Sequence, residues 1–308
     1  MLILKKFRGA VNRKLLSSPR KRGSRCGFTL TPAFAGAGSA GMMTAVLASV
    51  MILSSRPGQA GETRTACQLD ESYNGPHQEA FQKLRFYIPN LLSTTQLELA
   101  SDMGLDYQEG FRYPFTIGFV DEPLSGSEYA LAYVQLSRGD GGFRQRMNIN
   151  LEAYSRRPFN FDKVFRHEMS HAILSDAVGG DVFAKLPVWL IEGLAIWVAE
   201  QGEQLTRAEA HRYPAYAEKI LVSDLEGPRR ANLYPQYFLA IEYIVKTKGV
   251  GSLQNLLHDL VNERPLREAM AYNLGEDWET FQKNVRDFSI QYIRNLGTGS
   301  PLEREQPY

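Results

Sequence analysis

The stretch FDKVFRHEMSHAILSDAV, residues 161 to 178, decides how this chain folds and what chemistry it carries. Its apolar residues recur at intervals of three and four, which predicts a helix buried over most of its surface. The run His167-Glu168-Met169-Ser170-His171 places two histidines four residues apart. Residues at this spacing lie one turn above each other on a helix, so both imidazoles can bind one metal ion.

Glu168 follows the first histidine and completes an H-E-x-x-H motif. Its carboxylate can accept a proton from a water molecule whose pKa a zinc ion has lowered toward neutrality. The same letters occur by chance in other chains, as polar residues on a solvated helix face. Here the flanking residues are apolar, and buried histidines need a partner. We therefore expect one zinc ion per chain, bound by His167 and His171, with Glu168 as the general base.

The segment LPVWLIEGLAIW, residues 186 to 197, supplies the third ligand. Pro187 suits the first turn of a helix, and a nearly all-apolar helix is predicted from residue 188 to residue 201. Glu192 is the one carboxylate within 186 to 197, and binding to zinc would offset the cost of burying it. The alternative is a side chain that reaches solvent beside Gly193. Three protein ligands leave the fourth zinc position open for water, as catalysis requires.

H-E-x-x-H together with the downstream W-L-x-E-G-x-A motif, twenty residues separating His171 from Glu192, resembles the gluzincin zinc metallopeptidases. This clan of the peptidase MA-like superfamily includes thermolysin and the zinc aminopeptidases. The resemblance spans residues 81 to 293, and only the two motifs are specific. It implies an α+β fold of small bacterial exported type, with a small, mainly antiparallel sheet, an H-E-x-x-H helix and a helical C-terminal part. It also implies a zinc-dependent hydrolase that cleaves peptide bonds.

The same resemblance implies a donor to the oxyanion. The segment from Tyr234 to Val245 is similar to the helix that follows the glutamate ligand in gluzincins, whose opening tyrosine stabilises the oxyanion. Tyr234 holds that position, and Tyr237 one turn later is the competing candidate. The alternative for Tyr234 is an ordinary amphipathic tyrosine at the start of a helix.

One position departs from the pattern of the family. In thermolysin-like enzymes an acid one turn after the glutamate ligand orients a zinc-bound histidine, and this chain has Ile196 there. The partner of the histidine must then come from elsewhere, because metal-bound imidazoles need a second hydrogen bond. A backbone carbonyl, Asp176 and Glu200 are the candidates.

Strand and helix patterns predict the rest of the domain. A helix broken near Pro89 is expected over residues 79 to 104, and three strands follow it, over residues 115–120, 129–136 and 146–154. In gluzincins an extended peptide substrate pairs with the edge strand beside the zinc helix, and the resemblance implies that residues 147 to 154 are this edge strand. The glycine-rich stretch 137–142 is expected to be a hairpin turn rather than a mobile rim. Strands followed by helices indicate an α+β domain.

Four regions are expected along the chain. Residues 1–60 are an export signal or an N-terminal membrane anchor, 61–76 a flexible lead, 77–298 the catalytic domain and 299–308 a tail. The sheet part of the domain is expected at about 107–155 and the helical part at about 160–298.

The first 60 residues have the parts of an export signal: a basic region ending at Arg25, an apolar core over 41–53 and the cleavage site Gly58-Gln59-Ala60. A retained anchor is the alternative, because no charge occurs between Arg25 and Arg56. Either arrangement places the catalytic domain outside the cytoplasm, in the periplasm or the extracellular space.

Charge and cysteine usage narrow the possible partners. The first 60 residues hold ten of the 35 basic residues and no acid, so the remainder has 25 basic and 34 acidic residues, a net charge of −9. An acidic domain without basic and aromatic interleaving is not expected to bind nucleic acid. Cys26 and Cys67 are the only cysteines, and loss of the leader would leave no intramolecular disulfide. Cys67 is expected to be an exposed thiol.

Three functions compete at this point. The motifs favour a zinc metallopeptidase that acts on a peptide or protein substrate, and an amidase acting on envelope peptides differs from it only in substrate. The opposing class is a non-catalytic exported module of the same fold, which binds zinc or a peptide. Glu168 favours the enzyme, because a purely structural site needs no base. The segment Asn148-Ile149-Asn150-Leu151-Glu152 does not match the amine-binding strand of the aminopeptidases, which favours endopeptidase action.

Overall fold

The computed structural model describes residues 28–29, 64–106, 110–121, 131–139, 142–156, 159–212, 225–226 and 233–298 of the 308-residue chain. Apart from residues 28–29, the expected export signal or anchor lies outside these residues, as does the expected tail. No helix among the described residues has both the length and the apolar composition that a membrane span requires.

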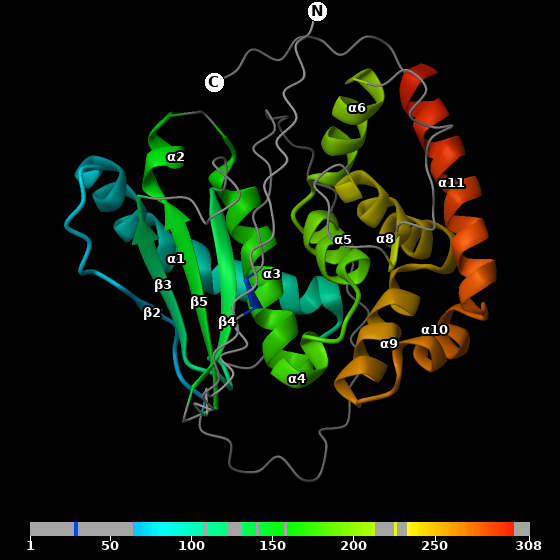
Figure 1. Ribbon diagram of the computed structural model, residues 1–308, viewed down its shortest axis with the longest axis horizontal. Coiled ribbons are helices and arrows are strands. Elements are labelled where there is room, and N and C mark those ends of the chain that lie inside the picture. Colours follow the sequence, from blue (N-terminus) through cyan, green and yellow to red (C-terminus); the bar gives the residue numbers. More distant parts are fainter. Residues whose placement is uncertain are drawn as a thin grey trace, which may run out of the picture.

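The strands form one mixed sheet (Figure 1). Its members are β1 (Phe28–Thr29), β2 (Gln68–Leu69), β3 (Phe115–Val120), β4 (Ala132–Gly139) and β5 (Gly142–Asn150), in the order β1-β4-β5-β3-β2. Strand β3 runs parallel to β2 and β5, whereas β4 runs antiparallel to β1 and β5. The expectation of a mainly antiparallel sheet is therefore wrong. Strand β4 follows β3 in the sequence but is not its neighbour in the sheet. The next strand, β5, pairs with both and lies between them.

Strand β5 corrects two expectations. It ends at Asn150, and Leu151–Arg156 forms helix α2 because the Asn150 carboxamide accepts a hydrogen bond from the backbone N–H of Ala153 at 3.0 Å. The expected strand over residues 146–154 was therefore too long. Because β5 lies between β4 and β3, it is not the edge strand. Strand β4 is nearer the edge, with two-residue β1 as its outer neighbour.

Strands β4 and β5 form the expected antiparallel hairpin, but residues 137–139 and 142 of the expected turn belong to the strands. Gly139 pairs with Gly142, so the two strands remain in register up to the turn. Within the expected flexible lead, Thr65 bridges to Phe111 and β2 pairs with β3. Backbone hydrogen bonds thus hold the lead at Thr65, at β2 and at Asp70. Cys67 is half-buried rather than exposed, and this burial raises the pKa of its thiol to about 12.

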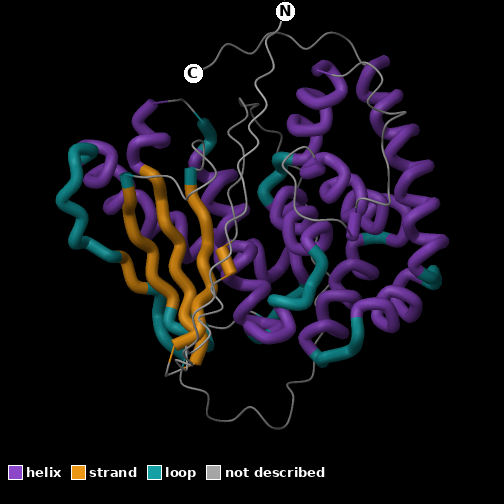
Figure 2. The backbone as a smooth tube through the Cα atoms, in the orientation of Figure 1, coloured by secondary structure: helices purple, strands orange, loops and turns teal. Residues whose placement is uncertain are grey.

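Helices make up most of the described chain (Figure 2). Beside α2 they are α1 (Gln78–Met103), α3 (Phe161–Val178), α4 (Gly180–Phe183), α5 (Val188–Val198), α6 (Gly202–Arg212), α8 (Tyr234–Lys248), α9 (Val250–Val261), α10 (Leu266–Leu274) and α11 (Trp278–Thr298). The sheet lies on one side of the molecule and helices α5 to α11 on the other, with α3 between them (Figure 1). The α+β expectation is confirmed at this level.

Helix α1 runs without interruption past Pro89, so the expected break is wrong. Proline removes one backbone donor from the helix. On the preceding turn, however, Leu84 and Ile88 are each only 1% exposed. Phe81 of the same helix packs edge to face on Phe119 of β3, with ring centroids 5.0 Å apart. This packing keeps the helix against the sheet despite the lost hydrogen bond.

Candidate metal centre

Helix α3 has the bounds that the sequence predicts, residues 161 to 178. The Asn160 side chain accepts a hydrogen bond from the backbone N–H of Lys163 at 3.1 Å, which caps the first turn. Gly179, with φ of 86°, ends the helix. The helix packs against β4 and β5 on one side and against α5 on the other. His167, Glu168 and His171 are consequently buried.

Helix α5 brings Glu192 to this helix. A Cβ on Gly193 would lie 2.3 Å from the carbonyl oxygen of Tyr237, because α8 crosses α5 at this point. Glycine is therefore the residue that lets the two helices approach. Glu192, the residue before it, is fully buried. The helix ends at Val198 and not at residue 201 as predicted.

Two histidines and one glutamate converge between α3 and α5. His167 Nε2 lies 3.5 Å from Glu192 Oε2, and His171 Nε2 lies 3.7 Å from Glu192 Oε1. One ligand atom from each residue falls within 4.8 Å of the others. A tetrahedral ion such as zinc, with ligands at 2.0–2.1 Å, separates them by about 3.3 Å. The cluster therefore fits a metal ion, and no second such group occurs in the part of the chain that the structure describes.

Electrostatics at the cluster favour a cation. Burial alone would lower the pKa of His167, but the hydrogen bond with Glu192 and the charges of Glu168 and Glu192 outweigh it. The pKa of His167 is therefore raised above its usual value. Two buried carboxylates beside two imidazoles form a site that positive charge stabilises.

Glu168 lies against the sheet. Its Oε2 atom accepts a hydrogen bond from the backbone N–H of Val134 in β4 at 3.0 Å. The side chain is fully buried and stands next to His167 in the chain. The expected general base is thus held at strand β4, beside the two histidines of the cluster.

Gln201 is the partner of His167 that the sequence did not reveal. Its Oε1 atom lies 3.0 Å from His167 Nδ1. Asp176 binds Arg64 and the N–H of Tyr113 instead, both at 3.1 Å. The Glu200 side chain is 81% exposed.

Neither expected acid therefore orients this histidine. The reason is the early end of α5 at Val198, followed by Glu200 with a φ of 53°. This left-handed residue changes the direction of the chain and brings Gln201 to α3. A left-handed glutamate leaves no signal in the sequence, because glycine and asparagine are the residues usually found there.

Tyr234 and Tyr237 both occupy the first turn of α8 and are both buried. Their ring centroids are 6.1 Å apart. The carbonyl oxygen of Tyr237 is the nearest atom that a Cβ on Gly193 would meet, and Tyr234 lies one turn before Tyr237. Both tyrosines therefore lie close to the contact between α8 and the part of α5 that carries Glu192. The choice between them as oxyanion donor stays a prediction.

No known protein-family model matches the chain, and no curated protein matches it either.

Proposed function

We propose that this protein is a zinc-dependent hydrolase of gluzincin type that cleaves peptide bonds. The observation that carries the proposal is the buried convergence of His167, His171 and Glu192 from two helices, with Glu168 beside them. Three protein ligands leave one position of a tetrahedral ion open, whereas structural zinc sites are closed by four. A carboxylate next to the ligands has a use in hydrolysis that a structural site lacks.

Each residue has a defined task in this reaction. Zinc, when bound, would act as a Lewis acid and lower the pKa of water in the site. Glu168 takes a proton from the attacking water and passes it to the leaving amine as the carbon–nitrogen bond breaks. Tyr234, or Tyr237 in its place, donates a hydrogen bond to the oxygen that becomes negatively charged. His167, His171 and Glu192 hold the metal.

The position of β4 supports a peptide as the substrate. Glu168 is bonded to the N–H of Val134, so the base lies beside a strand near the edge of the sheet. Residues 28–29 pair with Gln135 and Leu136 of the same strand, which is the kind of pairing an extended peptide makes. The expected N-terminal export signal supports action outside the cytoplasm, in the periplasm or beyond it.

Metal content and hydrolysis together test the proposal. The purified full chain should hold about one zinc ion by elemental mass spectrometry, and His171→Ala should lose it. His258→Ala is the matched control, because His258 is an exposed histidine of α9 that bonds Asn262.

Peptide hydrolysis should be measured on a fluorogenic peptide library. Glu168→Gln should keep the zinc and lower the rate by about 10²–10⁴-fold, the usual contribution of a general base. A wild type that takes up no zinc would refute the metal centre. Zinc-loaded wild type that cleaves no peptide would refute the enzyme and favour the non-catalytic module.

A further inference from the structure

The turn between α5 and α6, residues 199 to 201, is held in a conformation that its sequence does not favour. Glu200 has a φ of 53°, in the left-handed region that is strained for a non-glycine residue. The N–H of Gln201 donates to the carbonyl of Ile196 in α5 at 3.1 Å. Such a conformation persists when surrounding contacts determine it.

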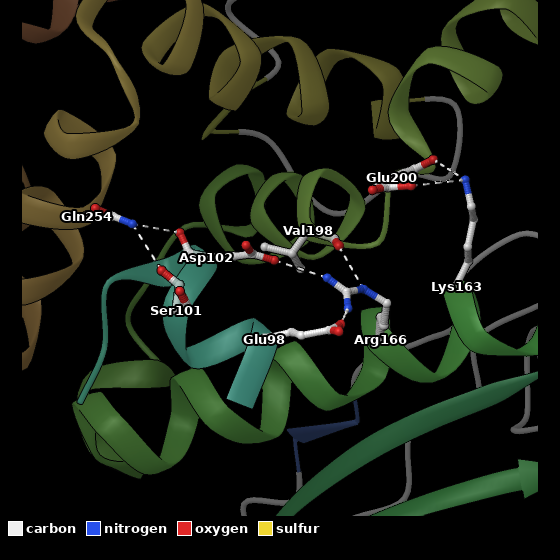
Figure 3. A network of polar contacts seen from close by, with 8 residues as sticks. All are labelled: Glu98, Ser101, Asp102, Lys163, Arg166, Val198, Glu200 and Gln254. Atoms are coloured by element: carbon white, nitrogen blue, oxygen red, sulfur yellow. Dashed lines mark hydrogen bonds and ion pairs between the residues drawn. The ribbon is translucent and has the colours of Figure 1, made fainter. Parts of the chain in front are cut away.

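Two basic side chains of α3 supply those contacts (Figure 3). Lys163 Nζ donates to the carbonyl oxygen of Glu200 at 2.8 Å, and Arg166 Nε donates to the carbonyl oxygen of Val198 at 3.2 Å. Lys163 lies one turn before His167 and Arg166 immediately before it. The helix that carries the histidines therefore also holds the turn that carries Gln201.

Arg166 is itself fixed by the end of α1. It pairs with Glu98, and its Nη2 atom lies 3.0 Å from Asp102 Oδ2 (Figure 3). Gln254 of α9 donates to the carbonyls of Ser101 and Asp102 at 3.1 and 3.2 Å, which joins the end of α1 to the helical part. The Arg166 side chain is 20% exposed. Its guanidinium therefore has one orientation, set by two carboxylates and a carbonyl.

We infer that Arg166 and Lys163 are positioning residues that, through the α5–α6 turn, fix Gln201 as the group that orients His167 toward the metal. The amide oxygen of Gln201 only accepts hydrogen bonds, so Nδ1 of His167 carries the proton. Nε2 then presents its lone pair toward Glu192 and the metal position. The inference rests on the proposed metal centre and extends it to residues that touch neither metal nor substrate.

Zinc affinity of the full chain, measured by competition with a chromophoric chelator, tests the role of Gln201. Gln201→Leu should weaken zinc binding by about 10–100-fold, as loss of a partner of a metal-bound histidine usually does. Gln201→Glu should restore the affinity, because a carboxylate also accepts from Nδ1. Gln145→Leu is the matched control, because Gln145 is a buried glutamine of β5 whose Oε1 accepts a hydrogen bond from the Ser175 hydroxyl of α3 at 3.0 Å. It should change the affinity by less than about threefold.

The role of Arg166 is tested by a double-mutant cycle. Arg166→Met should weaken zinc binding, and adding it to Gln201→Leu should weaken binding no further, because Arg166 acts through Gln201. Arg264→Met is the control, since Arg264 forms an ion pair with Asp259 in the C-terminal helices. Far-UV circular dichroism establishes that each variant is folded.

The outcomes separate the two proposals. Zinc affinity of Gln201→Leu equal to that of Gln145→Leu would overturn the inference, and so would additive effects in the cycle. Failure of the wild type to bind zinc would refute the metal centre itself.

Discussion

Glu168 and Glu192 place two carboxylates in the same buried region as two imidazoles. Each buried charge costs several kcal/mol unless neighbouring groups stabilise it. Burial would lower the pKa of His167, but Glu192 and Glu168 raise it, because the two carboxylates favour positive charge on this ring. A dication would offset the negative charge of the two carboxylates. The residues therefore form a site that is stabilised by metal binding and is costly without it.

Asp70 gives a prediction for the pH dependence of stability. Hydrogen bonds from Ser72, followed by that from Arg146, lower the pKa of this carboxyl to about 2. Arg146 Nη2 lies 2.8 Å from Asp70 Oδ2 and its Nε donates to Asn148, so the pair joins the segment after β2 to β5. A folded-state pKa below the unfolded value stabilises the protein above the unfolded pKa of about 3.9. This contribution is lost as the pH falls toward 2.

Asp70→Asn should therefore lower the urea midpoint at pH 6. The Asp70 and Arg146 side chains are 30% and 41% exposed, so solvent screening limits the effect to about 1 kcal/mol or less. The difference between variant and wild type should shrink as the pH is lowered from 5 to 3. Asp287→Asn removes an exposed pair with Lys283 and is expected to change little at either pH. A difference that is the same at pH 3 and pH 6 would contradict the assignment.

At the scale of elements, the contact between α5 and α8 determines where Glu192 lies. Gly193→Ala would place a methyl group 2.3 Å from the carbonyl of Tyr237 and 2.9 Å from a side-chain carbon of Ile241. The backbone atom cannot rotate away, so the helices must separate. Overpacking of this kind costs about 1–3 kcal/mol. The free energy of unfolding, measured in urea, should fall by this amount, and zinc should bind more weakly because Glu192 moves with α5.

Gly251→Ala is the matched control for this prediction. Gly251 also lies in a helix, α9, but a Cβ there would meet nothing within 4 Å. Alanine favours the helix by about 1 kcal/mol over glycine, so this variant should be as stable as the wild type or more so. Equal stabilities for the two alanine variants would show that the close approach at Gly193 is unimportant.

Elements specified by local signals were predicted well. Helix α3 was placed correctly because its apolar residues recur at helical spacing from residue 161 to residue 178, and in the structure Asn160 and Gly179 bound the same segment. His167 and His171 were found from their spacing of four residues on this helix. Glu192 was found because it is the one carboxylate within residues 186 to 197.

Elements set by distant contacts were not predicted. The order of the strands depends on how the β4–β5 hairpin folds back beside β3, and the continuity of α1 past Pro89 depends on its packing. Gln201 was missed for a similar reason, because contacts from Lys163 and Arg166 stabilise the left-handed Glu200.

For the whole molecule, the candidate metal centre joins two parts. His167 and His171 come from α3, which packs on the sheet, whereas Glu192 comes from α5, which packs on α8 among the C-terminal helices. The Arg166 network makes a second connection between the same parts, from the end of α1 to the turn after α5 (Figure 3). A metal ion would thus tie the two sides of the core together.

We therefore expect removal of the proposed zinc ion to lower the stability of the whole domain and to loosen the region between its two parts. A ligand that binds only the folded state stabilises it by about 2.7 kcal/mol at one hundred times its dissociation constant. A chelator should lower the melting temperature of the wild type by several degrees and leave that of His171→Ala unchanged.

Hydrogen exchange should show the largest loss of protection in α3 and α5, because they carry the candidate ligands. It should show little change in α10, which contributes none. Equal loss of protection in α10 and α5 would show that the metal acts on global stability alone, and an unchanged melting temperature would contradict the centre altogether.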